Sequence, residues 1–88
     1  MDIHEIINRN YAATCSRGLI TPDTTKQEFT VKMVEEIDEL NNEICFEHSD
    51  NEPVELADVI LVCLAYAKHF NIDILTELEK KTLYNETR

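Results

Sequence analysis

The sequence is poor in glycine and in strand-like alternation. It has one glycine in 88 residues, and no stretch alternates apolar and polar residues as a half-buried strand does. These absences argue against a β-rich fold and favour an all-α chain. A single domain over residues 1–88 is expected, and a lone domain of this size buries only about 60 % of its unfolded surface. We therefore expect a homodimer or homotetramer whose interface completes the core.

Positive charge is also scarce. The 8 lysine and arginine residues face 18 acidic residues, which gives a formal net charge of −10 at pH 7. Nucleic-acid polymers and anionic membrane surfaces are bound by basic patches, so both are disfavoured as partners. An acidic protein can still bind a polyphosphate when divalent cations lie between the two sets of negative charge.

No apolar stretch is long enough to span a bilayer. The most apolar region covers residues 54–67, whereas a transmembrane helix needs about 20 such residues. The first residues are polar and acidic, so we expect no signal peptide. Cys15, Cys45 and Cys63 are odd in number and scattered, which indicates reduced thiols and a cytoplasmic location. Cys45 and His48 are spaced like half of a zinc site, but no second pair completes it.

Hydrophobic periodicity predicts four helices, over residues 3–17, 25–46, 53–70 and 74–85. Asp2 and Thr25 stand where N-caps belong, each with a glutamate three residues later. Gly18 stands where a helix-ending residue belongs, and residues 71–73 separate the last two helices. The expected architecture is a four-helix, bundle-like fold.

Acidic side chains gather on the second of these helices. Its sequence VEEIDEL contains Glu35, Glu36 and Glu39, which fall within about 100° of arc at 3.6 residues per turn. Glu36 lies beside the apolar stripe of the helix, so it can point into a groove between helices. Glu39 follows one turn later on the same side. Taken alone, such a cluster is usually a solvated face.

Two further carboxylates change this interpretation. Glu55 and Asp58 lie one turn apart on the third helix, PVELADVILVCLAYA, which is otherwise almost wholly apolar. Burying an ionised carboxylate costs several kcal/mol, at order of magnitude, unless a partner compensates it. If the second and third helices pack about 8–10 Å apart, both acidic pairs meet in one small volume.

The positive charge available near these acids is small. Lys32 is the nearby basic residue on the second helix, and one lysine cannot neutralise four carboxylates. We therefore expect a hard divalent cation. Mg²⁺ suits carboxylate oxygens and is often bound jointly with substrate phosphates. A ferritin-like di-iron site is disfavoured because no histidine follows a glutamate by three residues, and no EF-hand loop is present.

A polar stripe lies on the last helix. Its members, at i, i+3, i+4 and i+7, are Lys81, Tyr84, Asn85 and Arg88. Two cations, an aromatic ring and an amide on one face can grip phosphates, stack on a base or sugar and hydrogen-bond a polar edge. A basic last turn also complements the helix dipole, so a purely structural role is the alternative.

Together these motifs resemble the MazG-like family of nucleotide pyrophosphohydrolases, over roughly residues 25 to 88. The resemblance rests on EExxE, ExxD and KxxYNxxR. It implies an all-α MazG-type fold completed by oligomerisation, and Mg²⁺-dependent hydrolysis of a nucleoside triphosphate between its α and β phosphates. The products would be a monophosphate and pyrophosphate, Mn²⁺ would be a substitute metal, and the cellular role would be house-cleaning of nucleotide pools.

The resemblance also assigns roles to residues. By analogy the metal ligands are Glu36, Glu39, Glu55 and Asp58. Glu35 is a further ligand or orients the attacking water, so Glu35, Glu36 and Glu39 form the catalytic set. The expected substrate contacts are Lys81, Tyr84, Asn85 and Arg88.

The alternative is a non-catalytic acidic helical module that oligomerises or binds a protein partner through the same core. Four converging acids favour the enzyme, because an interaction module has no reason to keep them. The preferred base and sugar, the number of metal ions, the choice between dimer and tetramer, and the role of the first helix stay open.

Overall fold

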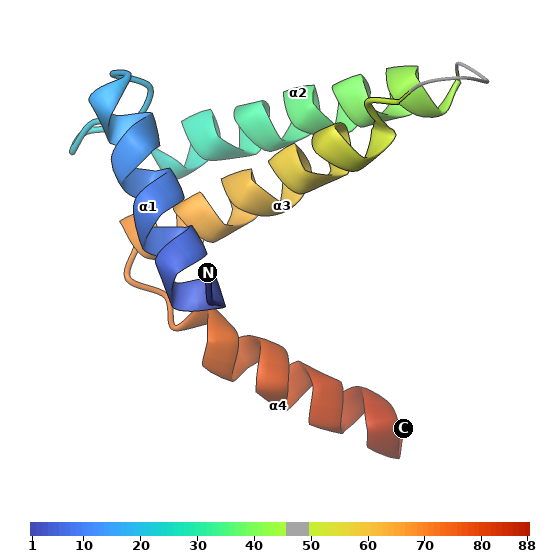
Figure 1. Ribbon diagram of the computed structural model, residues 1–88. Helices are drawn as coiled ribbons and strands as arrows, with labels where there is room; N and C mark the ends of the chain where they lie inside the picture. The colour runs from blue at the N-terminus through green and yellow to red at the C-terminus, as the bar shows by residue number, and fades with distance from the viewer. Residues whose placement is uncertain (46–49) are drawn as a thin grey trace.

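Four helices and no strands make up the described part of the chain, residues 1–45 and 50–88 of a computed structural model (Figure 1). The helices are α1 (Ile3–Ser16), α2 (Lys26–Ile44), α3 (Glu52–His69) and α4 (Ile74–Thr87). The all-α prediction is confirmed, and the predicted bounds differ from these by a residue or two. The predicted end of the second helix at Phe46, and His48 of the half zinc site, lie outside the described residues.

The predicted N-caps form where the sequence places them. The carboxylate of Asp2 accepts a hydrogen bond from the backbone N–H of Glu5 at 2.9 Å. At the start of α2, the Thr25 hydroxyl accepts from the Glu28 N–H, and the Glu28 carboxylate accepts from the Thr25 N–H. This reciprocal capping box satisfies backbone donors that have no partner inside the helix.

Left-handed residues end α1 and α3. Gly18 has φ +75°, and the N–H groups of Gly18 and Leu19 donate to carbonyls in the last turn of α1. Asn71 has φ +56°, and the N–H groups of Asn71 and Ile72 do the same for α3. Glycine and asparagine adopt this region more readily than other residues, which explains why the helices end here. After Asn71 the chain bends by 117° into α4.

The helices pack as an antiparallel pair with a third helix across it. α2 and α3 lie side by side, α1 crosses α3, and α4 leads away from the other three (Figure 1). The core lies where the α1–α2 loop meets the start of α2 and the end of α3. Phe29 is its centre, 4 % exposed, with the rings of Tyr66, His69 and Phe70 at centroid distances of 5.7, 5.3 and 5.7 Å.

A large apolar surface stays uncovered. On α2, α3 and α4 the exposed apolar side chains include Val34, Ile37, Leu56, Ile60, Leu78 and Leu83. α3 is thus covered on one side only. Among the described residues, no single helix has both the length and the apolar content to cross a membrane; α3 and α4 meet that test only when counted together across their bend.

Candidate functional site

Three carboxylates from α2 and α3 converge in the middle of the helix pair. One oxygen each of Glu36, Glu39 and Glu55 lies within 4.8 Å of the other two. Glu36 and Glu39 are one turn apart on α2, and Glu55 stands in the first turn of α3. The structure therefore brings together three of the four acids that the sequence places on facing helices.

Glu36 is the buried member of this cluster. It is 8 % exposed, and its Oε1 lies 3.1 Å from Nζ of Lys32. Its other oxygen, Oε2, and Oε2 of Glu55 are buried with no hydrogen-bond partner among the described residues. Buried carboxylate oxygens are costly when they are unpartnered. The cluster therefore holds more negative charge than the surrounding side chains compensate.

Glu39 is affected by the charge of its neighbours. The negative charge of Glu36 raises the pKa of Glu39 above its usual value. Loss of hydration and the charge of Glu55 act in the same direction. Each of these causes favours a neutral Glu39. A cation placed among the three oxygens would reverse that preference.

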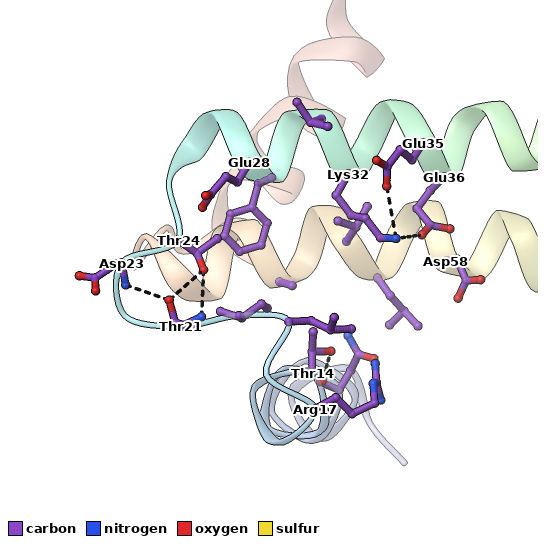
Figure 2. Close-up of a pocket in the computed structure, with 18 residues that line it drawn as sticks. Thr14, Arg17, Thr21, Asp23, Thr24, Glu28, Lys32, Glu35, Glu36 and Asp58 are labelled. Carbon is purple, nitrogen blue, oxygen red and sulfur yellow. Dashed lines mark hydrogen bonds and ion pairs between the residues drawn. The ribbon is translucent and has the colours of Figure 1, made fainter.

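Lys32 supplies the compensation that the chain offers. Its hydrogen bond to Glu36 raises the pKa of Lys32, against the opposing effect of partial burial. The same ammonium group lies 3.5 Å from Oε2 of Glu35, whose side chain is 57 % exposed. Glu35 therefore faces Lys32 at the surface and stands outside the group of three (Figure 2).

Asp58 lies beside the cluster without joining it. It is half-buried and follows Glu55 by one turn, but its oxygens are not within the 4.8 Å group. Together with Glu36 it lines a cavity of about 570 Å³ between the helices (Figure 2). The predicted set of four is thus present as three converging acids, with the fourth at the edge of this cavity.

The cavity is the part of the site that the sequence did not indicate. Its walls come from α1, the α1–α2 loop, α2 and α3. The wall on this side consists of Asn10 and Thr14 of α1 and of Arg17, the C-cap residue of that helix. Their spacing, i, i+4 and i+7, places them on one face of a helix, and this is the signal that was available in the sequence.

The C-terminal stripe forms at a distance from the acids. Nζ of Lys81 lies 4.5 Å from the centroid of the Tyr84 ring, and the guanidinium carbon of Arg88 lies 5.9 Å from it. These residues and Asn85 are exposed. Because the bend after α3 directs α4 away from the α2–α3 pair (Figure 1), the stripe and the carboxylate cluster do not meet within one chain.

The described chain is therefore an all-α domain with a carboxylate cluster beside an open cavity. Comparison with known protein families, curated proteins and solved structures finds no match. The functional inference consequently depends on the residues of the site themselves.

Proposed function

We propose that this protein is a Mg²⁺-dependent nucleoside triphosphate pyrophosphohydrolase of the MazG-like type. The reaction is cleavage between the α and β phosphates of a ribo- or deoxyribonucleoside triphosphate, with release of monophosphate and pyrophosphate. The observation that supports it best is the pair of buried, unpartnered oxygens on Glu36 and Glu55, beside a cavity large enough for a nucleotide.

The donor set fits a hard divalent cation. All the converging atoms are carboxylate oxygens, the ligand type that Mg²⁺ and Mn²⁺ prefer. The two unpartnered oxygens supply a reason for the ion to bind, since it would satisfy both at once. Glu36, Glu39 and Glu55 would hold it, and Asp58 at the cavity edge would be the fourth ligand. Lys32 already takes up Oε1 of Glu36.

The acidic residues of the chain would have separate roles in this reaction. When bound, Mg²⁺ shields phosphate oxygens and makes a water molecule more acidic. Glu36 and Glu55 would hold the metal, and the metal would bind the substrate phosphates. Glu35, held by Lys32 at the surface, orients the attacking water or accepts its proton. A buried Glu36 keeps bulk water away from its side of the site.

The exposed apolar surface supports a homo-oligomer. Uncovered side chains such as Leu56 and Ile60 of α3 and Leu78 of α4 are about half exposed, and covering them by a second copy would complete the core. In this arrangement the stripe of α4 would serve the site of another subunit. Dimer and tetramer both meet the requirement, and the free thiols of all three cysteines agree with a cytoplasmic enzyme.

One assay tests the activity. The protein is incubated with mixed dNTPs and Mg²⁺, and monophosphate and pyrophosphate are measured. We expect both products from wild type and neither from Glu36→Gln or Asp58→Asn. Asp38→Asn is the matched control, because Asp38 is exposed on α2 and lies outside the acidic group and the cavity. Release of orthophosphate would remove the α–β assignment, and full activity of both site variants would refute the ligand assignment.

The competing function is a non-catalytic helical module that associates through its apolar faces. The exposed apolar side chains of α2, α3 and α4 favour this role as well. The same assay separates the two functions. An oligomer of normal stability that releases neither product from any triphosphate, with Mg²⁺ or with Mn²⁺, would favour the module.

A further inference from the structure

Asn10 of α1 and the exposed C-cap residue Arg17 face the cavity without side-chain partners among the described residues. Asn10 and Arg17 line it, and neither side chain has a hydrogen bond or ion pair with any other residue in the described ranges 1–45 and 50–88. Thr14 lies between them, but its hydroxyl already donates to the carbonyl of Asn10 at 2.8 Å. Figure 2 shows α1 end-on, with the Arg17 side chain extending toward the α2–α3 pair. α1 therefore contributes free donors to a cavity whose opposite wall is acidic.

The remaining polar groups of the cavity are mostly engaged. The Glu28 carboxylate accepts a hydrogen bond from the Thr25 N–H, and the Thr24 hydroxyl accepts one from the Thr21 N–H at 2.9 Å. Lys32 is paired with Glu35 and Glu36. Asp23 points away from the cavity (Figure 2). Asn10 and Arg17 are thus the polar side chains best placed to recognise a ligand.

The two ends of the cavity differ in chemistry. Glu36 and Asp58 mark one end, next to the proposed metal site. The lining also contains a group of apolar side chains, Ile20, Phe29, Val62 and Ala65, beside the polar side chains that the first helix contributes. Phosphate groups need charge and hydrogen bonds, whereas a base and a sugar present faces that apolar side chains cover well. A nucleotide whose phosphates lie on the acids would therefore place its nucleoside against these apolar side chains, in the cavity that Asn10 and Arg17 also line.

From this arrangement we infer that Asn10 and Arg17 contact the base of the nucleotide and determine which base the enzyme prefers. The inference rests on the proposed function and adds that these residues recognise the base of the substrate. Arg17 carries only donors, so it favours bases with a carbonyl oxygen, which has two acceptor lone pairs where a ring nitrogen has one. Guanine, cytosine, thymine and uracil have such a carbonyl, and adenine does not. dATP is accordingly the poorest of the four common deoxynucleotides.

The test is a comparison of Arg17→Met with wild type on dATP, dGTP, dCTP and dTTP. Methionine keeps an unbranched apolar side chain and removes every donor. Losing a hydrogen bond from a charged donor corresponds to about a tenfold effect or more. We expect KM for the three carbonyl-bearing substrates to rise by that factor with kcat nearly unchanged, and KM for dATP to rise least. Asn10→Ala should shift KM in the same direction by less.

Two further variants complete the design. Arg9→Met is the matched control, because Arg9 is exposed on the same helix and does not line the cavity; its kinetics should equal those of wild type. Arg17→Lys keeps the charge without the planar fork and should fall between wild type and Arg17→Met. Arg17→Lys also tests the inference if the methionine variant folds poorly.

Each result decides something. A wild type that prefers dATP, or an Arg17→Met enzyme with unchanged KM values, overturns the inference and leaves the proposed function intact. A uniform loss of kcat on all four substrates places Arg17 on the phosphates and also overturns it. A wild type that hydrolyses no triphosphate removes the proposed function, and this inference with it.

Discussion

The hydroxyl of Tyr11 lies 2.8 Å from Nδ1 of His69, and Nε2 of the same ring lies 3.1 Å from the carbonyl oxygen of Thr24. A carbonyl only accepts, so Nε2 carries a proton, and in the neutral ring Nδ1 accepts from the Tyr11 hydroxyl. One imidazole thus joins α1, the α1–α2 loop and the end of α3. These three elements all contribute residues to the wall of the cavity.

This bridge gives the first prediction. Tyr11→Phe removes one partly buried hydrogen bond and should lower the free energy of unfolding by about 1 kcal/mol. His69→Ala also removes ring contacts with Phe29 and Phe70 and should cost about 2–3 kcal/mol. Urea denaturation measures both. Tyr84→Phe, at an exposed tyrosine, is the control and should be neutral; equal stability of Tyr11→Phe and wild type would show that the bridge contributes nothing.

Helix positions were predictable because their signals are local. A threonine with a glutamate three residues later starts α2, and an isolated glycine ends α1, as the sequence indicates. Asn71 ends α3 by the same backbone conformation as Gly18. Such signals depend on a few neighbouring residues, so no tertiary contact was needed to find them.

The site was predictable only in part, because its geometry depends on packing between helices. Helical periodicity places Glu36 and Glu55 on facing sides, and the structure brings them together. Periodicity does not predict that Glu35 faces Lys32 at the surface or that Asp58 lies at the edge of the cavity. It also does not predict that α1 forms one wall of that cavity. The direction of α4 follows from a bend after Asn71 whose size no sequence pattern specifies.

The second prediction concerns Mg²⁺ and thermal stability. Without metal the oxygens of Glu36, Glu39 and Glu55 repel one another, so Mg²⁺ should raise Tm at neutral pH by preferential binding to the folded state. At pH 5 the shift should be smaller, because protons compete for the same oxygens. Scanning calorimetry gives the shift. In Glu55→Gln it should shrink, while Asp38→Asn should behave as wild type. A shift in Glu55→Gln as large as in wild type would mean that the ion binds elsewhere.

A third prediction concerns the pH dependence of the metal-free protein. The charge of Glu36 raises the pKa of Glu39 above its usual value of 4.5 in the folded state, so the folded chain binds a proton more tightly than the unfolded chain does. Stability therefore falls as pH rises from the ordinary pKa of Glu39 through its raised one. We expect Glu39→Gln to lack this part of the decline. The measurement is Tm against pH with a chelator present, and parallel curves for the two proteins would contradict the origin assigned to the shift.

The fourth prediction isolates the ammonium group of Lys32. Lys32→Met leaves buried Glu36 without its cation and should destabilise the metal-free chain by about 1 kcal/mol, a small value because Lys32 is half exposed to solvent. Mg²⁺ should restore more stability to this variant than to wild type. Lys80→Met removes a pair on the solvent-exposed surface, with Glu77 at 3.6 Å, and should have no effect. Equal chemical denaturation curves for the two lysine variants would show that Lys32 does not compensate the buried acid.

The last prediction tests whether α4 acts on the site of another subunit. Glu36→Gln would remove a proposed metal ligand and Lys81→Met a proposed substrate contact, so each homo-oligomer should be inactive. If the stripe of α4 serves a second copy, a subunit carrying Lys81→Met has an intact acid cluster that receives Lys81 from a subunit carrying Glu36→Gln. After equal amounts of the two variants exchange subunits in a two-fold dimer, about half of the dimers contain one subunit of each variant. One of the two sites in each such dimer is complete, so about a quarter of wild-type activity should return. Pyrophosphate release from the mixture, compared with the sum of the separate variants, measures this. Activity no greater than that sum would place Lys81 outside the catalytic site or in the site of its own chain.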